Sequence, residues 1–443
     1  MRHAHLGLSG LVLGLLLSLF VVIGPSSAAS GPPVRSGSVA GQVSTAGNVL
    51  AGRPGKRRWV PSQGVTFNDP MSRRNRAIMG KVVKSIKATK KRESIRIATW
   101  NLDDRPAVTE LIRARKRGVR VQVVVSGVVD NPNYTRLARA LNRNKKDKSF
   151  AVQCNGACRS NRKIMHSKVF LFSRVRHVEN ISMFGSANLT TPAGNRQWND
   201  MVTTYDRRVY NYLSKVFGEY ARDKAVRNPF DVHKVGKFRI TLFPVGNRNP
   251  VLEELRKIRC TGVTRGAGSN GRTVIRIAVA GWFDAYGGQI AERLRTMWDN
   301  GCNIKIITTL AGRGVNQIMK DPRGRGPVPM RELSIDRNGD EIPERYLHMK
   351  AMSVSGVYKK DSSANLIFTG SPNWSARAQR SEEIWVRMID QRRLANRYAN
   401  WINRLYASPY TSARVSSWAD LGVRGGPSPM GTSPKLPDWF ELE

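Results

Sequence analysis

The sequence predicts an α/β fold made of two similar halves, each with a mixed, mostly parallel sheet flanked by helices. Three observations predict it: strand-like and helix-like segments alternate, their order occurs twice, and each half contains the same short polar phrase. The two copies are offset by roughly 180 residues, which indicates an internal duplication. A chain of 443 residues with 40% apolar residues can fill both halves, so a disordered or fibrous protein is excluded.

The first half begins with a short strand at residues 65–67, followed by a helix at 78–86 whose apolar residues recur at helical spacing. An alternating strand is expected at 95–98. Pro106 then opens a helix, because proline is favoured at the first helical position. The valine-rich segment at 119–125 is the next strand.

The second half repeats this order. Its strands and helices are expected in turn at 240–243, 251–258, 274–279, 290–297 and 304–307. Both halves also end alike, since an amphipathic helix follows Asp206 in the first and Asp390 in the second. These matches predict an N-terminal half at 63–230 and a C-terminal half at 237–407.

The ends of the chain are expected to lie outside the fold. Arg2 and an apolar run before the small residues at Ala28 and Ala29 predict a signal peptide over residues 1–29 and a secreted protein. An uncleaved membrane anchor is the less favoured alternative, because the apolar run is slightly long. Residues 30–62 are expected to form a flexible leader, and 408–443 a tail without apolar periodicity.

The charge of the chain points to anionic partners. Lys and Arg number 74 and Asp and Glu 32, which gives a net charge of +42. Removal of the signal peptide deletes only Arg2, so 73 basic and 32 acidic residues leave +41 on the mature protein. Such a surface attracts polyanions or an anionic membrane, and charge alone does not rank nucleic acid, lipid and acidic polymers. We expect a monomer.

Four cysteines fit an oxidising compartment and allow three pairings. Cys154 with Cys158 would close a small loop, and Cys260 with Cys302 would then join the end of a helix to the turn before a strand. A zinc site is the rival interpretation, but no further Cys or His flanks either pair at ligand spacing. We therefore expect disulfides and no bound metal.

Two polar phrases recur at matching points of the repeat, with their histidines 182 residues apart. They are His166-Ser167-Lys168 with Gly185-Ser186-Ala187-Asn188, and His348-Met349-Lys350 with Gly370-Ser371-Pro372-Asn373. On a strand, side chains two residues apart share a face, so His and Lys of each phrase line one surface. The returning strand brings Ser and Asn beside them. One His-x-Lys would suit any surface strand, but two copies in a duplicated frame favour a site.

These residue types fit chemistry at a phosphodiester. Such a reaction needs an attacking group and an acid for the leaving oxygen, and imidazole serves either role near neutral pH. Two lysines and two asparagines would hold the phosphoryl oxygens and neutralise the developing charge. Those cations take the place of a metal, so no cofactor is expected.

With these phrases the sequence resembles the phospholipase D superfamily over most of residues 65–406. The resemblance implies a pseudo-twofold fold with one active site between the halves and a phosphohistidine intermediate. It implies His166 as nucleophile and His348 as general acid. The phosphate-binding residues that it implies are Lys168, Lys350, Asn188 and Asn373, with Ser186 and Ser371 beside them.

The sequence departs from the family pattern at two positions. An Asp usually follows the motif lysine by five residues, but Ser173 and Ser355 stand there. A carboxylate that orients each imidazole must then come from elsewhere, and Asp200 and Glu383 are the nearest candidates. A solvated turn acid is the alternative interpretation of both.

Three functions follow. The first is a secreted phospholipase D-type phosphodiesterase that cleaves a phospholipid headgroup, and the second is a metal-independent nuclease of the same superfamily. The third is an inactive basic binding protein, which the intact His, Lys and Asn residues disfavour. Basic runs at 143–148 and 323–325 are interpreted as solvated loops, or as the rim of a cleft that steers an anionic substrate.

Overall fold

The computed structural model describes residues 59–416, except positions 74, 128–130, 145, 147, 162, 340 and 341. The predicted signal peptide, most of the predicted leader and residues 417–443 of the predicted tail lie outside the described residues. Among the described residues, no helix combines the length and apolar character needed to cross a membrane.

The first half forms one sheet with the strand order β4-β3-β2-β5-β6-β7-β1. Its elements are β1 (Gly64–Asn68), α1 (Ala77–Ala88), β2 (Ser94–Thr99), α2 (Arg105–Lys116), β3 (Arg120–Val125), α3 (Pro132–Asn142), β4 (Phe150–Gln153), β5 (Lys168–Val175), β6 (Val178–Gly185), α4 (Thr191–Asn195), β7 (Gln197–Thr204) and α5 (Arg207–Arg222). Asp104 caps the N-terminus of α2 by accepting the N–H group of Ala107, and Pro106 lies in its first turn.

The second half forms a sheet with the order β13-β12-β11-β15-β16-β17-β9-β8. Its elements are β8 (Asp231–Val235), β9 (Phe238–Leu242), α6 (Pro250–Leu255), β10 (Ile258–Arg259), β11 (Val274–Trp282), α7 (Asp284–Asp299), β12 (Asn303–Ala311), α8 (Arg313–Lys320), β13 (Met330–Ile335), β14 (Arg345–Leu347), β15 (Lys350–Tyr358), β16 (Asp361–Gly370), α9 (Ala376–Arg380), β17 (Ile384–Met388), α10 (Arg392–Tyr406) and β18 (Thr411–Ser412).

The two sheets share one plan, from β4 and β13 at one side to β1 and β9 at the other. The predicted α/β class with mixed sheets is therefore confirmed. The balance of strand directions differs from the prediction, because antiparallel pairs outnumber parallel ones in each sheet. The reason is that the hairpins β5–β6 and β15–β16 insert antiparallel beside the first parallel strands, β2 and β11.

Element bounds differ from expectation at three places. Helix α6 ends at Leu255, so Ile258 belongs to the short strand β10 and not to the helix. Strand β8 falls between the two predicted halves and pairs with β9 of the second sheet. Strand β18 falls in the predicted tail and pairs with β13.

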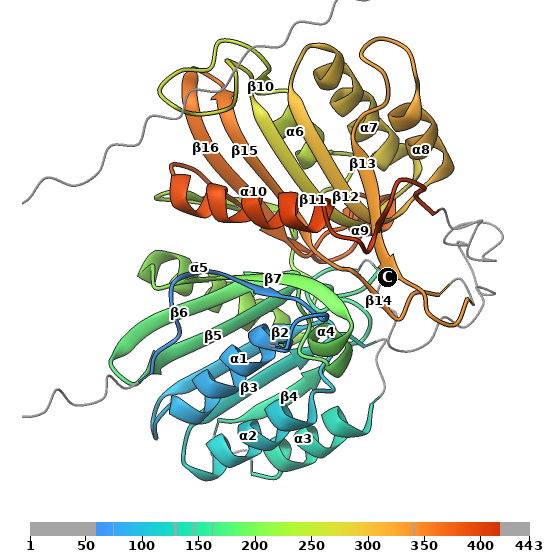
Figure 1. Cartoon of the computed structure of the whole chain (residues 1–443). Coiled ribbons are helices and arrows are strands. Elements are labelled where there is room, and N and C mark those ends of the chain that lie inside the picture. Colours follow the sequence, from blue (N-terminus) through green and yellow to red (C-terminus); the bar gives the residue numbers. More distant parts are fainter. Residues whose placement is uncertain are drawn as a thin grey trace, which may run out of the picture. The chain divides into compact units, whose positions relative to one another are not determined.

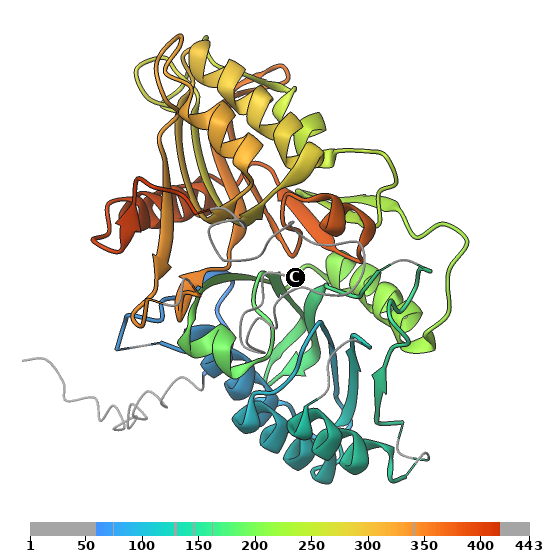
Figure 2. The same cartoon turned by 90° about the vertical axis from the view of Figure 1, so that its right-hand side faces the viewer.

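Three apolar cores hold the described residues together. One lies between α1, α2, α3 and the first sheet, and another between α6, α7, α8 and the second sheet. A third is shared by both halves and contains the apolar faces of α5 and α10. In both views these two helices lie at the junction of the halves (Figure 1, Figure 2).

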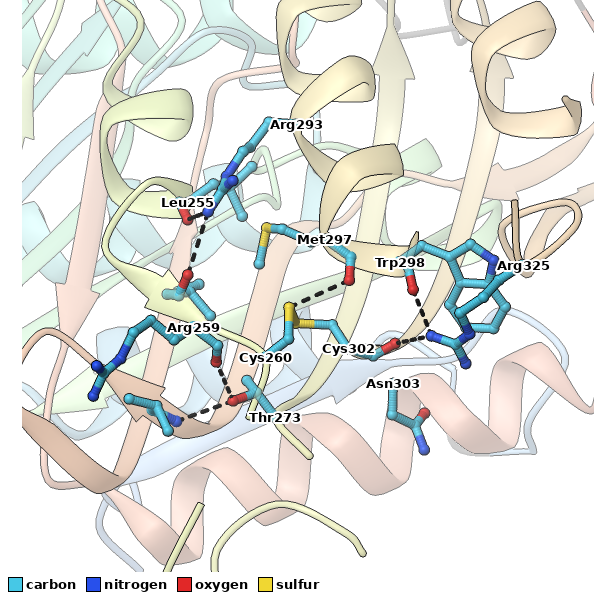
Figure 3. The surroundings of a disulfide bond; sticks show 12 residues. Leu255, Arg259, Cys260, Thr273, Arg293, Met297, Trp298, Cys302, Asn303 and Arg325 are labelled. Atoms are coloured by element: carbon cyan, nitrogen blue, oxygen red, sulfur yellow. Dashed lines mark hydrogen bonds between the residues drawn. A yellow bond between two sulfur atoms is a disulfide. The ribbon is translucent and has the colours of Figure 1, made fainter. Parts of the chain in front are cut away.

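Both predicted disulfides are present, Cys154 with Cys158 and Cys260 with Cys302. Cys302 lies directly before β12, as expected, whereas Cys260 follows the short strand β10 instead of ending a helix. The second disulfide joins these two points beside the C-terminus of α7 (Figure 3).

The basic run at 323–325 caps a helix and does not line the site. The Arg325 guanidinium lies 3.8 Å from the Trp298 ring centroid and donates to the backbone carbonyls of Trp298 and Cys302 (Figure 3). A cation there complements the C-terminal dipole of α7. Cys302 precedes one end of β12, roughly 20 Å along the strand from the end that contacts the His348 phrase. In the other basic run, at 143–148, the Lys148 carbonyl accepts a hydrogen bond from the Gln122 side chain. Gln122 lies near the start of β3, as Cys302 lies before the start of β12.

Candidate active site

Each His-x-Lys phrase begins a strand that lies beside the carboxyl end of a parallel strand. Lys168 is paired with Thr99, the last residue of β2, and Lys350 with Val279 near the end of β11. The carboxyl ends of parallel strands are where α/β folds place their ligands. The two phrases therefore occupy equivalent, favourable positions in the two sheets.

The glycines of the Gly-Ser-x-Asn phrases allow the next strand to approach closely. A Cβ atom on Gly185 would lie 2.3 Å from the Asp200 carbonyl oxygen, and one on Gly370 would lie 2.1 Å from that of Ile384. Both contacts are too short for any side chain. The two glycines thus explain why β7 and β17 can pass directly beside the site.

The imidazole of His166 is held by a carboxylate from the other half of the chain. Its Nδ1 lies 2.8 Å and 3.0 Å from the two carboxylate oxygens of Glu383. Both side chains are buried, with 1% and 0% of their surfaces exposed. An ionised carboxylate only accepts hydrogen bonds, so Nδ1 carries the proton and Nε2 is the unprotonated nitrogen of the neutral imidazole.

The imidazole of His348 is held by an amide, again across the halves. Its Nδ1 lies 3.0 Å from Oδ1 of Asn199. The amide is oriented by its own contacts, since Nδ2 donates to Gln197 Oε1 at 2.9 Å and Oδ1 accepts from the Ser186 hydroxyl at 2.8 Å. Oδ1 is therefore the acceptor and Nδ1 of His348 is the donor.

Both lysines act on one histidine. The pKa of His166 is held well below its usual range by burial and by the positive charges of Lys168, Lys350 and Arg377. Lys350 comes from the second phrase, so the two phrases form one electrostatic site. Each ammonium group also donates to the carbonyl of the histidine two residues before it, at 2.6 Å for Lys168 and 2.8 Å for Lys350.

The two asparagines are fixed at the same rim. Oδ1 of Asn188 accepts from the Thr99 hydroxyl at 3.2 Å, and Oδ1 of Asn373 accepts from the Gly281 N–H group at 3.1 Å. These bonds orient both amides. Their burial and their place after each returning strand fit the predicted phosphate-binding role.

The two serines are engaged within the protein. The Ser186 hydroxyl donates to Asn199 and accepts the N–H group of Asp200 at 3.0 Å. The Ser371 hydroxyl accepts the N–H group of Ile384 at 3.0 Å. We therefore assign them to the support of β7 and β17, in place of the predicted direct contact with substrate.

The prediction for Asp200 fails by one residue. Its carboxylate accepts hydrogen bonds from the Tyr398 hydroxyl at 2.6 Å and from the Thr369 hydroxyl. Adjacent strand residues point to opposite faces, so Asn199 meets His348 while Asp200 faces α10. Burial raises the pKa of Asp200. The predicted partner Glu383 does contact an imidazole.

Asn199 was missed because the two loops differ in length. From Asn188 to Asn199 there are 11 steps along the chain, whereas Asn373 to Glu383 takes 10. The two halves align when equivalent backbone hydrogen bonds are compared. The Ser186 N–H group donates to the Asp200 carbonyl, and the Ser371 N–H group donates to the Ile384 carbonyl. Asn199 is then the counterpart of Glu383, which only strand register could reveal.

Ser173 and Ser355 lie far from the imidazoles. The Ser173 hydroxyl accepts the N–H group of Ser94 at 2.7 Å and donates to Glu93, at the start of β2. The Ser355 hydroxyl accepts the N–H group of Gly268 at 3.0 Å. Five strand residues separate each from its lysine, roughly 17 Å. The missing motif aspartates therefore do not deprive either histidine of its partner.

Three of the tryptophans are core residues. Trp198, Trp282 and Trp374 are buried, and the last two pack edge to face with centroids 5.2 Å apart. No pattern in the sequence indicated the two rings that approach the imidazoles. Trp100 lies 5.9 Å from His166, and Tyr346 lies 6.1 Å from His348, both edge to face.

Within the described part of the chain, no group of three or more His, Cys, Asp and Glu side chains is placed to hold a metal ion. The cations in the site are the lysine ammonium groups and Arg377, whose charge reaches His166. Neutralisation of a phosphoryl group by side chains is therefore possible with residues that the chain itself supplies.

Comparison with known proteins supports this architecture. A family model described as a cardiolipin synthase, PLD-like domain, matches residues 82–221, which contain the first His-x-Lys phrase. Phosphatidylserine synthase from Haemophilus influenzae Rd KW20 is similar in structure, with 12% identity, a TM-score of 0.53, and coverage of 79% of this chain and 87% of that chain. Residues 82–221 are thus similar to a PLD-like domain, and the described chain has the same fold as that synthase.

Other solved structures are also similar to this phospholipase D-like chain. Polyphosphate kinase from Porphyromonas gingivalis has 12% identity and a TM-score of 0.51, with 78% of this chain and 51% of that chain covered. The chain thus spans about half the length of that kinase. Nuc from Salmonella typhimurium, a phospholipase D family member, has 21% identity and a TM-score of 0.27, with coverage of 36% and 94%. No curated protein sequence matches the chain.

The family model shows a PLD-like domain over residues 82–221, and the structural neighbours show the fold. The resemblance inferred from the two polar phrases is therefore confirmed. At these identities the structural neighbours show the fold alone, so substrate and reaction follow from the site.

Proposed function

We propose that this chain is a metal-independent phosphodiesterase that works through a covalent phosphohistidine on His166. The observation that carries the proposal is the pair of buried imidazoles, each held at Nδ1 by a polar side chain of the opposite half. This arrangement leaves two Nε2 atoms to work on one phosphorus, with the lysine ammonium groups beside them.

The unequal partners of the two imidazoles assign their roles. When Nε2 of His166 attacks phosphorus, the ester oxygen leaves and the ring becomes cationic while Nδ1 keeps its proton. The Glu383 carboxylate neutralises that cation. His348, held by a neutral amide, gives its Nε2 proton to the leaving oxygen. Water then attacks the phosphohistidine, His348 takes one of its protons, and His166 is released.

The low pKa of His166 fits the nucleophile role. Burial and the nearby ammonium and guanidinium groups keep its imidazole unprotonated at neutral pH, so the Nε2 lone pair is not blocked. The phosphate of the substrate would place its negative charge beside these cations. Lys168, Lys350, Asn188 and Asn373 are the residues proposed to bind it.

A phospholipid headgroup ester is the substrate that we propose first. The match to a cardiolipin synthase, PLD-like domain, supports a lipid phosphodiester. Trp59 and Tyr410 are the large hydrophobic side chains exposed on the described surface, so contact with an anionic membrane would depend on charge. Secretion, cleavage of the signal peptide and a monomeric state are further parts of the proposal, supported by the sequence.

A nucleic-acid backbone is the second candidate, and two observations favour it. The net charge of +42 suits a polyanion. A hollow of about 430 Å³ is lined by Phe230, Arg380 and several amide side chains, and the Arg248 guanidinium lies 5.0 Å from the Phe230 ring centroid. Basic groups around an aromatic ring suit single-stranded nucleic acid.

The test is a paired assay of the mature protein in chelator. Vesicles of phosphatidylcholine with phosphatidylglycerol, and single-stranded DNA, are offered to the wild type, His166→Ala and His177→Ala. His177 is exposed at the tip of the β5–β6 hairpin, so its variant is the matched control. Headgroup release that is lost only in His166→Ala supports the lipid enzyme. DNA cleavage with the same dependence supports the nuclease, and turnover that survives in His166→Ala overturns the mechanism.

A further inference from the structure

Glu382 is a buried carboxylate next to Glu383 that the mechanism above does not use. No part of its surface is exposed. Its oxygens accept the backbone N–H groups of Cys158 at 3.0 Å and Arg159 at 2.6 Å. The side chain therefore grips the loop that the Cys154–Cys158 disulfide closes.

The backbone of Glu382 is joined to the His166 phrase itself. Its carbonyl accepts the N–H group of His166 at 2.9 Å and the hydroxyl of Ser167 at 3.0 Å. Its own N–H group donates to the Ile164 carbonyl at 2.8 Å. One residue thus connects the disulfide loop, the His166 strand and the carboxylate that orients the imidazole.

The disulfide loop is anchored to the sheet on its other side. The Cys154 N–H group donates to the Val125 carbonyl at 3.0 Å, at the end of β3. A Cβ atom on Gly127 would lie 1.9 Å from the Cys154 carbonyl oxygen, so the loop lies directly against the backbone there. Cys154 and Cys158 have 2% and 1% of their surfaces exposed.

The second half lacks this arrangement at the equivalent place. The N–H group of His348 donates to the carbonyl of Trp198, as that of His166 does to Glu382. Trp198 has no carboxylate, and its indole donates to Asp69 at 3.1 Å. The carboxylate and the disulfide loop therefore serve only the histidine that is paired with Glu383.

We propose that Glu382 is a positioning residue for His166, and that the Cys154–Cys158 disulfide fixes the two N–H groups that hold it. The inference rests on the proposed function, because it concerns the rate of attack by His166. Loss of the grip frees β17 at its first residue, so Glu383 no longer holds Nδ1 at the angle that aims Nε2 at phosphorus.

The first test is Glu382→Gln. Glutamine offers one acceptor and one donor, so its NH₂ group would face one of the two backbone N–H groups. We expect kcat to fall by about 10–100-fold with little change in KM, because substrate contacts are untouched. Glu382→Asp keeps two acceptors and should recover part of the rate. Equal kcat in the wild type and Glu382→Gln would overturn the proposal.

The second test compares the two disulfides. The Cys154→Ser/Cys158→Ser variant should lower kcat in the same way as Glu382→Gln. The Cys260→Ser/Cys302→Ser variant is the matched control, because that disulfide lies at the other end of β12 from the His348 phrase (Figure 3). It should lower the melting temperature and leave kcat unchanged well below that temperature. The reverse outcome, or equal effects on kcat, would contradict the proposal.

These experiments separate failure of this inference from failure of the proposed function. Wild-type protein without turnover in any diester assay would remove the proposed function. Wild-type turnover with an unaffected Cys154→Ser/Cys158→Ser variant would remove only the positioning role. A melting experiment shows whether Glu382→Gln folds. If it does not, Glu382→Asp and the serine variants test the positioning role. The pH dependence of kcat/KM adds a readout that loss of stability alone would not move.

Discussion

The two halves of the molecule have nearly the same frame but differ in the side chain behind each histidine. In the first, a carboxylate holds His166, and in the second, an amide holds His348. Both partners come from the strand that follows Gly-Ser-x-Asn in the opposite half, so each half completes the other. A duplicated frame thus supplies symmetric positions, while one residue at each position gives the two imidazoles different chemistry.

The difference reaches beyond the imidazoles. Next to Glu383, the carboxylate of Glu382 accepts a hydrogen bond from the disulfide loop. Next to Asn199, the equivalent residue is Trp198. On the Asn199 side, Ser186 and Gln197 orient the amide instead. In the proposed mechanism, the first imidazole becomes positively charged and the second gives up a proton. Four predictions test this comparison, from the largest expected effect to the smallest.

Loss of either histidine should reveal its role through the leaving group. His166→Ala removes the nucleophile and should abolish turnover of every substrate. His348→Ala should lose about 10²–10⁴-fold on an alkyl diester, because the alkoxide needs a proton to leave. On a p-nitrophenyl diester it should lose much less, since p-nitrophenolate leaves unprotonated. Steady-state rates on both substrates check this, and a larger p-nitrophenyl rate in His166→Ala than in His348→Ala would reverse the assignment.

Exchange of the two partners should have unequal effects. Glu383→Gln leaves the hydrogen bond possible but removes the charge, so kcat should fall by about 10–100-fold. Asn199→Asp adds a carboxylate beside His348, raises the pKa of that imidazole and moves the alkaline limb of the profile to higher pH. Profiles of kcat/KM for both variants measure this. Equal losses without a shift in Asn199→Asp would show that the asymmetry has no catalytic meaning.

The acid limb of the wild-type profile should lie below the usual histidine range. Burial and three cations lower the pKa of His166, so Nε2 stays unprotonated as pH falls through 6.5. The unfolded chain takes up that proton near pH 6.5, so the contribution of His166 to stability is present above that pH. It is lost as pH falls toward the lowered folded pKa. An acid limb above pH 6.5 would contradict the burial argument.

Asp200→Asn should have the smallest effect on turnover, about threefold or less, because Asp200 faces Tyr398 and not His348. Its pKa is raised by burial, so its stabilising share is full below pH 3.8 and is lost as pH rises through the folded value. Asparagine does not titrate. The melting temperature of the variant should therefore rise relative to that of the wild type between pH 4 and pH 7. A large loss of kcat in the variant would show that Asp200 takes part in catalysis.

Much of the site could be predicted from the sequence because the phrases are local. His and Lys two residues apart must share a strand face, and the repeat places both pairs at equivalent points. The disulfide of Cys154 with Cys158 was predictable for a related reason, since a short loop leaves its ends close together. Glu383 was found as a carboxylate next to a strand that follows the phrase.

The predictions that failed were those that depend on strand register or on long-range contacts. Asn199 and Asp200 are neighbours, and only the pairing of β6 with β7 decides which of them faces the site. The basic run at 323–325 was interpreted as a solvated loop or a cleft rim, and it lies in an exposed loop beside the C-terminus of α7. The mostly antiparallel pairing of the strands was also not predicted. A hairpin inserted into a sheet does not change the apolar periodicity from which strands are predicted.

The sequence by itself determined the duplicated α/β frame, the two His-x-Lys phrases, the cysteine pairs and the strongly basic charge. Each of these features follows from residue spacing or composition, which folding does not change. Only the tertiary structure decided that His166 meets Glu383, that His348 meets Asn199, and that Glu382 ties the first of these pairs to a disulfide loop. Those contacts join residues 149 to 224 positions apart, and the packing of one half against the other creates them.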